Sequence, residues 1–132
     1  MKSKIDKLLI LLLFCISCNE RKSLADYITT RENEYWRWED NCQQSSSVYF
    51  TFDKDGVFNK YLKYLKEGFV LYNKDTDVQE EDRTWSIKND TIFVWRHQEY
   101  KIISYNDNEI SLTYNHYKTK DICKIKLIKE LK

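Results

Sequence analysis

The sequence contains no proline and only two glycines among its 132 residues. Collagen-like chains and the Gly/Pro-rich class of disordered segments need these residues in abundance, so both classes are excluded. A chain of this length is enough for one domain and not for two. We therefore expect a single folded domain.

An excess of charge of one sign is also absent. Lys and Arg together number 22 and Asp and Glu together number 21, which gives a net charge of +1. Removal of residues 1–17, which hold three lysines and one aspartate, would leave a net charge near −1. A near-neutral chain without a basic stripe is poorly suited to phosphate backbones, so we expect no nucleic acid partner.

The longest apolar run is short. Leu8–Ile16 is apolar over nine residues, whereas a helix needs about 20 apolar residues to cross a bilayer. Three lysines precede this run and small residues follow it, which is typical of a secretory signal. We expect residues 1–17 to be a signal peptide with a helical apolar segment, and not a permanent membrane span.

Two cysteines, Cys15 and Cys18, stand at the end of this segment. Ile16-Ser17-Cys18 resembles the lipobox of bacterial lipoproteins, in which the cysteine becomes the first residue and is diacylated. The resemblance implies lipidation of Cys18, and two acyl chains such as palmitate would anchor the protein stably. The alternatives are a soluble secreted protein and a redox CxxC pair. The redox pair normally opens a helix of a packed domain, and here it falls at the end of a signal.

The residue after the lipidated cysteine bears on the membrane to which a lipoprotein is sorted. Asn19 does not resemble the aspartate that retains some lipoproteins in the inner membrane. The expected location is therefore the outer membrane, with the protein on its periplasmic or cell-surface face. Residues 18–34 are polar and lack strand alternation, so we expect a tether with one helical turn.

Aromatic residues make up 15% of the chain, with 10 Tyr and 4 Trp, and they favour half-buried strands. From residue 35 onward, short alternating runs are separated by turn signals such as Asp-Gly at 55–56 and Asn-Asp at 89–90. One run, "VFNKYLKYLK", is ambiguous. Its lysines recur every three residues at 60, 63 and 66, so a helical turn competes with a strand.

The whole pattern predicts an all-β fold over residues 35–132. We expect eight or nine short strands in an antiparallel up-and-down meander. A meander of this size removes its exposed edges by closing into a barrel.

The segments "YFTFDKDG", "WSIKNDTIFV" and "YKIISYNDNEISLTY", followed by an amphipathic last strand, resemble the small lipocalin-like lipoproteins of Gram-negative bacteria. The resemblance covers roughly residues 35–129. It implies a compact lipocalin-like β-barrel and an envelope location, and it brings no catalytic residues.

Cys42 and Cys123 remain after signal removal. One follows the first predicted strand and the other lies in the last, and these strands are neighbours if the barrel closes. Because an exported chain meets an oxidising compartment, we expect a disulfide. The alternative is a pair of buried free thiols.

No catalytic or metal motif is evident. His97 and His116 lack the spacing for a zinc site, and we expect them at hairpin ends. Asp53, Asp55 and Gly56 resemble the start of a calcium loop, but its twelfth position holds Tyr64 in place of Glu. We expect a plain turn there and a solvated acidic loop at 74–82. Ser45–Ser47 lack the nucleophile elbow. We expect no cofactor, no metal and no enzymatic activity.

The aromatic set supports two functions. A small barrel either fills with side chains or holds one small ligand. In the first hypothesis, inward residues bind a small apolar molecule; these are Trp36, Trp38, Phe50, Phe52 and Trp85. In the second, the core is solid and the protein contacts another envelope protein through its rim or exposed aromatics. Side chains alternate between the two faces of a strand, and Trp95 is out of step with Ile92 and Val94. We therefore expect Trp95 on the outer face of the barrel.

Overall fold

The structure is a computed structural model and describes residues 22–43, 48–73 and 82–132. The predicted signal peptide, Cys18, the serines at 45–47 and residues 74–81 of the acidic loop lie outside the described residues.

The described chain is all-β apart from one short helix, and its nine strands agree with the eight or nine that were expected. Helix α2 spans Leu24–Ile28. The strands are β1 Glu34–Asp40, β2 Val48–Phe52, β3 Phe58–Tyr64, β4 Gly68–Leu71, β5 Trp85–Lys88, β6 Ile92–Trp95, β7 Gln98–Tyr105, β8 Glu109–Asn115 and β9 Ile122–Leu131. The ambiguous lysine-rich run therefore forms strand β3.

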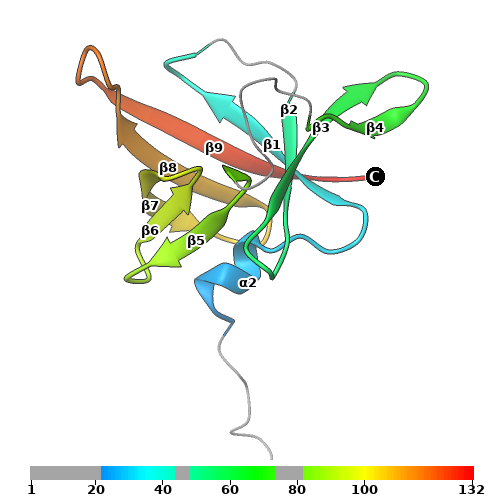
Figure 1. The fold of residues 1–132 in the computed structure, drawn as a ribbon, viewed down its shortest axis with the longest axis horizontal. Coiled ribbons are helices and arrows are strands. Elements are labelled where there is room, and N and C mark those ends of the chain that lie inside the picture. Colours follow the sequence, from blue (N-terminus) through cyan, green and yellow to red (C-terminus); the bar gives the residue numbers. More distant parts are fainter. Residues whose placement is uncertain (1–21, 44–47, 74–81) are drawn as a thin grey trace, which may run out of the picture.

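All strand pairs are antiparallel, and the sheet order is β4-β3-β2-β1-β9-β8-β7-β6-β5. The up-and-down order is confirmed, because chain neighbours pair on both sides of a central junction. This junction joins the first and last strands from Glu34↔Leu131 to Asp40↔Ile125. Figure 1 shows the long β8 and β9 running beside β1 across a strongly curled sheet.

The sheet curls into a half-barrel. The barrel prediction required a continuous hydrogen-bonded ladder that closes the sheet, and the described strands do not form one. Strands β4 and β5 are the two ends of the strand order. A single bridge, Val57↔Thr84, links the segments that precede β3 and β5. Two hydrogen bonds form there: Phe58 N donates to Arg83 O at 3.2 Å, and Trp85 N donates to Gly56 O at 2.9 Å. The outer half of β3 pairs with β4 instead, so the β3–β4 hairpin projects away from the body (Figure 1).

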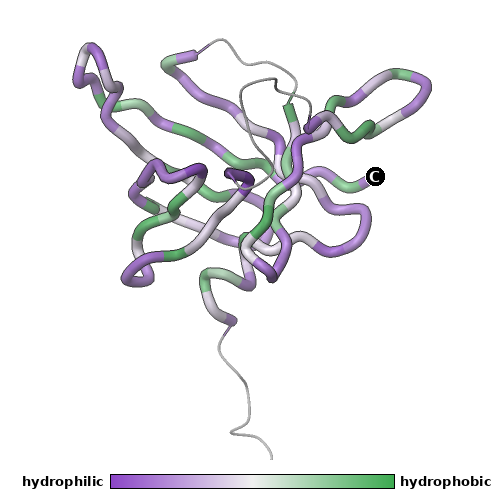
Figure 2. The backbone as a smooth tube through the Cα atoms, in the orientation of Figure 1, coloured by the Kyte–Doolittle hydropathy of each residue, from purple (hydrophilic) through white to green (hydrophobic). Residues whose placement is uncertain are grey.

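The inner face of the curled sheet carries the core. Its fully buried side chains include Trp36, Phe52, Phe93, Ile110, Leu112, Ile125 and Leu127. Residues two apart along a strand share a face, and this explains why Cys123, Ile125 and Leu127 are all fully buried. Figure 2 shows the complementary pattern, with hydrophilic residues gathered at the turns.

Helix α2 covers one end of the half-barrel, which we call the closed end. Ser23 is its N-cap, and the Ser23 and Asp26 side chains form a reciprocal capping box. Leu24 and Ile28 are buried and belong to the core cluster. This helix corresponds to the helical turn expected within residues 18–34, and its two apolar residues pack into the domain.

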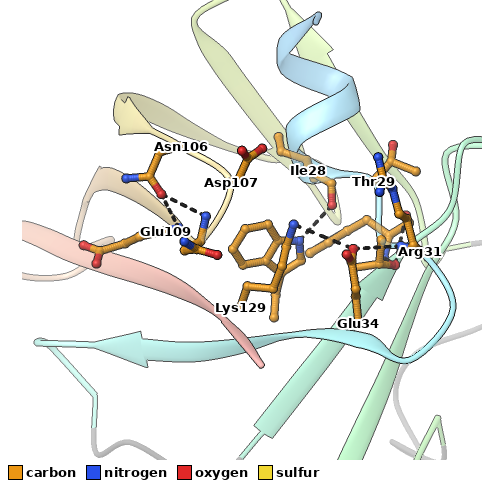
Figure 3. A network of polar contacts seen from close by, with 12 residues as sticks. Ile28, Thr29, Arg31, Glu34, Asn106, Asp107, Glu109 and Lys129 are labelled. Carbon is orange, nitrogen blue, oxygen red and sulfur yellow. Dashed lines mark hydrogen bonds and ion pairs between the residues drawn. The ribbon is translucent and has the colours of Figure 1, made fainter. Parts of the chain in front are cut away.

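A polar network fixes the same end (Figure 3). Trp36 Nε1 donates to the carbonyl of Ile28 at 2.8 Å. Lys129 Nζ lies 3.7 Å from Glu34 Oε2 and 4.8 Å from the centroid of the Trp36 ring. Glu34 Oε2 also accepts from the backbone N–H of Arg31 at 3.0 Å. The chain that leaves α2 is thus tied to both β1 and β9.

Candidate functional site

The opposite end of the half-barrel, which we call the open end, contains a pocket of about 500 Å³. It lies between β1, β2, β3, β6 and β7 and the segments that adjoin them. Its lining residues are Trp38, Gln43, Val48, Phe50, Phe58, Lys60, Tyr72, Asn73, Arg83, Trp95, Arg96, Gln98 and Tyr100. Six of these residues are aromatic and six are polar or charged, so the pocket combines an aromatic floor with a polar rim. Its size is within the usual range of small-molecule sites.

Trp95 is the centre of the aromatic floor of this pocket. Its ring centroid lies 4.5 Å from that of Trp38, 4.6 Å from that of Phe50 and 5.4 Å from that of Phe58. All three contacts are edge-to-face, a geometry that aromatic rings favour because ring edges are positive and faces negative. The floor is therefore a connected set of rings and not a collection of separate side chains.

The indole N–H of Trp95 is buried without a hydrogen-bond partner. By contrast, Trp36 Nε1 bonds to Ile28 O, and Trp85 Nε1 donates to Asp53 O at 3.0 Å. A buried donor without an acceptor is destabilising, and contact with ring faces compensates only weakly. The tryptophan at the centre of the pocket is thus the least satisfied of these three.

Polar side chains surround the floor near the Val57–Thr84 bridge. Asn59 Oδ1 accepts from Arg83 Nη1 at 3.1 Å and from Asn73 Nδ2 at 3.0 Å. Asn73 Oδ1 in turn accepts from the backbone N–H of Lys60 at 3.0 Å. Lys60 and Arg83 take part in further interactions as well. These contacts hold one side of the rim in place.

A covalent and hydrogen-bonded clamp joins β1, β8 and β9 at the open end. Cys42 and Cys123 form a disulfide with a Cα–Cα distance of 5.6 Å. The adjacent Asp40 is buried; it accepts from Tyr114 Oη at 2.6 Å and from the backbone N–H of Cys42 at 2.8 Å. Burial and the nearby Asp40 charge raise the pKa of Tyr100, on the pocket wall, to about 12. Its phenol is therefore neutral at physiological pH.

The predicted ligand-binding residues divide between this pocket and the core. Trp38 and Phe50 line the pocket. Trp36, Phe52 and Trp85 are buried in the core cluster and are not among the lining residues.

The prediction that Trp95 faces outward is wrong. Phe93 and Trp95 are buried, whereas Ile92 and Val94 are partly exposed. All four residues are apolar, so parity within β6 could not identify the inner face. Pairing could have done so, because Trp95 lies opposite Trp85 in the register. Tyr100 was also missed, and its only sequence signal is alternation within β7.

The other candidates occupy turns. His97 and His116 lie in the turns after β6 and β8. Residues 53–56 form a hairpin turn, in which Gly56 N donates to Asp53 O at 3.0 Å and Gly56 has φ of +80°. In the described residues, Asp40, Cys42 and Cys123 are close enough to share a metal. The two sulfur atoms are bonded to each other, however, and metal ligation needs thiolates.

Searches for a matching protein family and for similar curated proteins found nothing. No protein-family model matches the sequence, and no curated protein matches it significantly. Within the ranges that the structure describes, no helix has the length and apolar character to span a membrane. The site must therefore be interpreted from its own chemistry.

Proposed function

We propose that the protein is a lipid-anchored envelope protein that binds a small apolar ligand in the open-end pocket without transforming it. The observation that supports this proposal is the difference in packing between the two ends of the inner face of the sheet. The closed end is filled by Trp36, Phe52 and Ile28, whereas the open end keeps about 500 Å³ above the rings around Trp95. Binding there would remove apolar ligand surface from water, which is the main source of affinity in such sites.

A lipocalin-like barrel is the fold that this function implies. The Val57–Thr84 bridge brings the β3 and β5 sides together at one point, and the inner face is lined by side chains of both halves of the sheet. We infer that the half-barrel acts as a cup, with α2 as its base and the pocket as its mouth.

The anchor part of the proposal depends on the lipobox resemblance of residues 16–18. Lys22, the first described residue, leads directly into α2 at the closed end. An anchor at Cys18 would therefore hold the closed end near the outer membrane and leave the pocket at the distant end. Labelling of the full-length protein with an alkynyl palmitate analogue tests this. We expect Cys18→Ser to abolish the label and Cys15→Ser to retain it; label that persists in Cys18→Ser would refute the anchor.

The absence of catalytic function is also part of the proposal. The described lining residues include no carboxylate, histidine, serine or cysteine. Of the two phenols in the lining, Tyr72 and Tyr100, that of Tyr100 has a raised pKa and is a poor general base near neutral pH. Binding without reaction is the activity that these groups support best.

A second function, an interaction module for another envelope protein, is favoured by the β3–β4 hairpin. Leu65 at its tip is fully exposed, and Val70 and Leu71 on β4 and Tyr72 directly after it are also exposed. Because β4 is an edge strand, its free backbone groups could pair with another chain. Exposed apolar side chains on such an edge are typical of contact surfaces.

Titration of the purified full-length protein with the neutral probe N-phenyl-1-naphthylamine distinguishes these functions. We expect saturable enhancement of the probe's emission, and we expect Trp38→Ala to weaken binding about tenfold because ring contacts are lost. The matched control, Leu65→Ser on the hairpin tip, should bind as the wild type does. Equal binding by Trp38→Ala, or no saturable binding at all, would overturn the ligand-binding proposal and favour the interaction module.

A further inference from the structure

Among the described residues that line the open-end pocket, all charged groups have the same sign. Lys60, Arg83 and Arg96 are cationic, and the described lining residues include no carboxylate. The aromatic floor beside them lowers the local dielectric, which strengthens the interaction of these charges with a bound group. A purely apolar ligand would leave this property of the pocket unused.

The three cations are not equivalent. Arg83 is bonded to Asn59, Lys60 Nζ lies 5.5 Å from the centroid of the Tyr72 ring, and both residues have additional interactions. Arg96 is exposed, and among the described carboxylates none is within ion-pair distance of its guanidinium. The positive charge that is accessible to a ligand is therefore mainly that of Arg96.

The backbone at Arg96 provides a second, independent observation. Arg96 and His97 form the two-residue turn between β6 and β7, with φ of +49° and +67°. The turn between β5 and β6 has the same left-handed geometry, with φ of +52° and +57°, but uses Asn89 and Asp90. Asn and Asp tolerate this conformation, and arginine does not favour it. Strain of this kind is often retained where the side chain has a function.

The turn is held firmly against the neighbouring strand. Arg96 N donates to the carbonyl of Thr84 at 3.1 Å, next to the bridge that links the two sides of the half-barrel. The guanidinium is also near enough to Tyr100 to act electrostatically on the phenol, where it opposes the rise in the pKa of Tyr100. Arg96 thus extends from a fixed backbone toward the aromatic floor.

We propose that Arg96 binds the anionic group of an amphiphilic ligand whose apolar body lies on the aromatic floor. This inference rests on the proposed ligand-binding function and specifies its ligand class as an organic anion, such as an aryl carboxylate or sulfonate. A guanidinium suits this role because it stays charged and can donate two parallel hydrogen bonds to such a group.

A matched pair of probes tests the inference on the purified full-length protein. N-phenyl-1-naphthylamine and 8-anilinonaphthalene-1-sulfonate share their ring system and differ by the sulfonate. We expect the sulfonate to bind about tenfold more tightly than the neutral probe, as one charge-assisted contact at a partly exposed site would give. Added salt should weaken binding of the sulfonate alone.

Variants assign the preference to one residue. We expect Arg96→Asn to abolish the preference for the sulfonate over the neutral probe and to raise Tm by about 2–4 °C through relief of the turn. The control, Lys54→Gln, removes one positive charge near α2 and should retain the preference.

The possible outcomes separate the two proposals. If the neutral probe binds but the sulfonate has no advantage, or Arg96→Asn keeps that advantage, the inference is wrong and the proposed function stands. If neither probe binds saturably, both are wrong. A fall in Tm for Arg96→Asn would show that the arginine is structural and would contradict the strain argument.

Discussion

The two ends of the half-barrel are held together by different chemistry. At the closed end, α2 inserts Leu24 and Ile28 into the core, and Trp36 Nε1 donates to Ile28 O at 2.8 Å. At the open end, Trp95 Nε1 has no partner, and the Cys42–Cys123 disulfide joins the ends of β1 and β9. The closed end is stabilised by the side chains that fill it, and the open end by a covalent bond.

The difference explains how a small domain can contain an open pocket and remain folded. Packing stabilises a fold by excluding water from its interior, and an open pocket forgoes part of that contribution. A cross-link stabilises the fold without occupying the interior, because it restricts the unfolded chain. The disulfide and the Asp40–Tyr114 hydrogen bond therefore hold the open end where side chains do not fill it.

Removal of the disulfide is the strongest test of this difference between the two ends. Cys42 and Cys123 are 81 residues apart in sequence, and a cross-link over such a loop contributes about 4.5 kcal/mol in the chain-entropy model. We expect Cys42→Ser to lower the free energy of unfolding by this amount in urea denaturation. Hydrogen exchange should accelerate more in β8 and β9 near the open end than in α2. An unchanged urea midpoint would show that packing alone holds both ends.

A matched pair of substitutions compares the ends residue by residue. Trp36→Phe removes buried ring atoms and the bond to Ile28 O, and we expect a loss of about 3 kcal/mol in the free energy of unfolding. Trp95→Phe removes a similar group whose N–H is unpaired, and we expect about 2 kcal/mol. The difference of about 1 kcal/mol represents one hydrogen bond. Equal losses would mean that the bond to Ile28 contributes nothing to the contrast.

Alkaline pH should weaken the open end. The pKa of Tyr100 is raised to about 12 by burial and by the Asp40 charge, and the pKa of Tyr114 is raised by burial and by its bond to Asp40. A raised folded-state pKa gives stability that is complete below the unfolded value near 10 and is lost as pH rises through the folded value. For Tyr100 we expect a loss of about 1–2 kcal/mol between pH 10 and pH 12. Urea denaturation of Tyr100→Phe should show a shallower decline, and an equal decline would exclude Tyr100 as the cause.

Much of the fold could be predicted from the sequence because the relevant signals are local. Period-two alternation predicted eight or nine strands and left only the run of β3 ambiguous. The turns at 53–56, 89–90 and 106–108 carry Asp-Gly or Asn-Asp pairs that suit their geometry. The adjacency of β1 and β9 was predicted as the contact that closes a barrel. Incomplete closure could not be predicted, because it depends on β3 pairing with β4 over its outer half.

The candidate site was predicted only in part, for the same reason. Trp38 and Phe50 were identified from strands with one clear apolar face. Trp95 was missed because β6 is apolar on both faces, so its orientation depends on pairing with β5 and β7. The role of α2 was missed because the burial of Leu24 and Ile28 depends on packing against the end of the half-barrel, which the local sequence does not reveal. Position along the barrel axis is a tertiary property, and it separates Trp36 and Phe52 in the core from Trp38 and Phe50 in the pocket.

The smallest expected effect concerns the cap of α2. The Ser23 side chain accepts from Asp26 N at 3.3 Å, and the Asp26 carboxylate accepts from Ser23 N and from Ser23 Oγ. These bonds lower the pKa of Asp26. Ser23→Ala should reduce the free energy of unfolding by about 1 kcal/mol at neutral pH. The exposed Ser86→Ala on β5 serves as the control and should have little effect.

The effect of Ser23→Ala should also depend on pH. A lowered folded-state pKa gives stability that is present above the unfolded pKa of Asp26 and is lost as pH falls through the folded value. The difference between wild type and Ser23→Ala should therefore shrink in urea titrations as pH is lowered below about 4. Because α2 closes one end only, binding of N-phenyl-1-naphthylamine at the other end should be unchanged at neutral pH. Weaker probe binding in Ser23→Ala would show that the two ends are coupled, and the separation of a filled base from an open mouth would then be wrong.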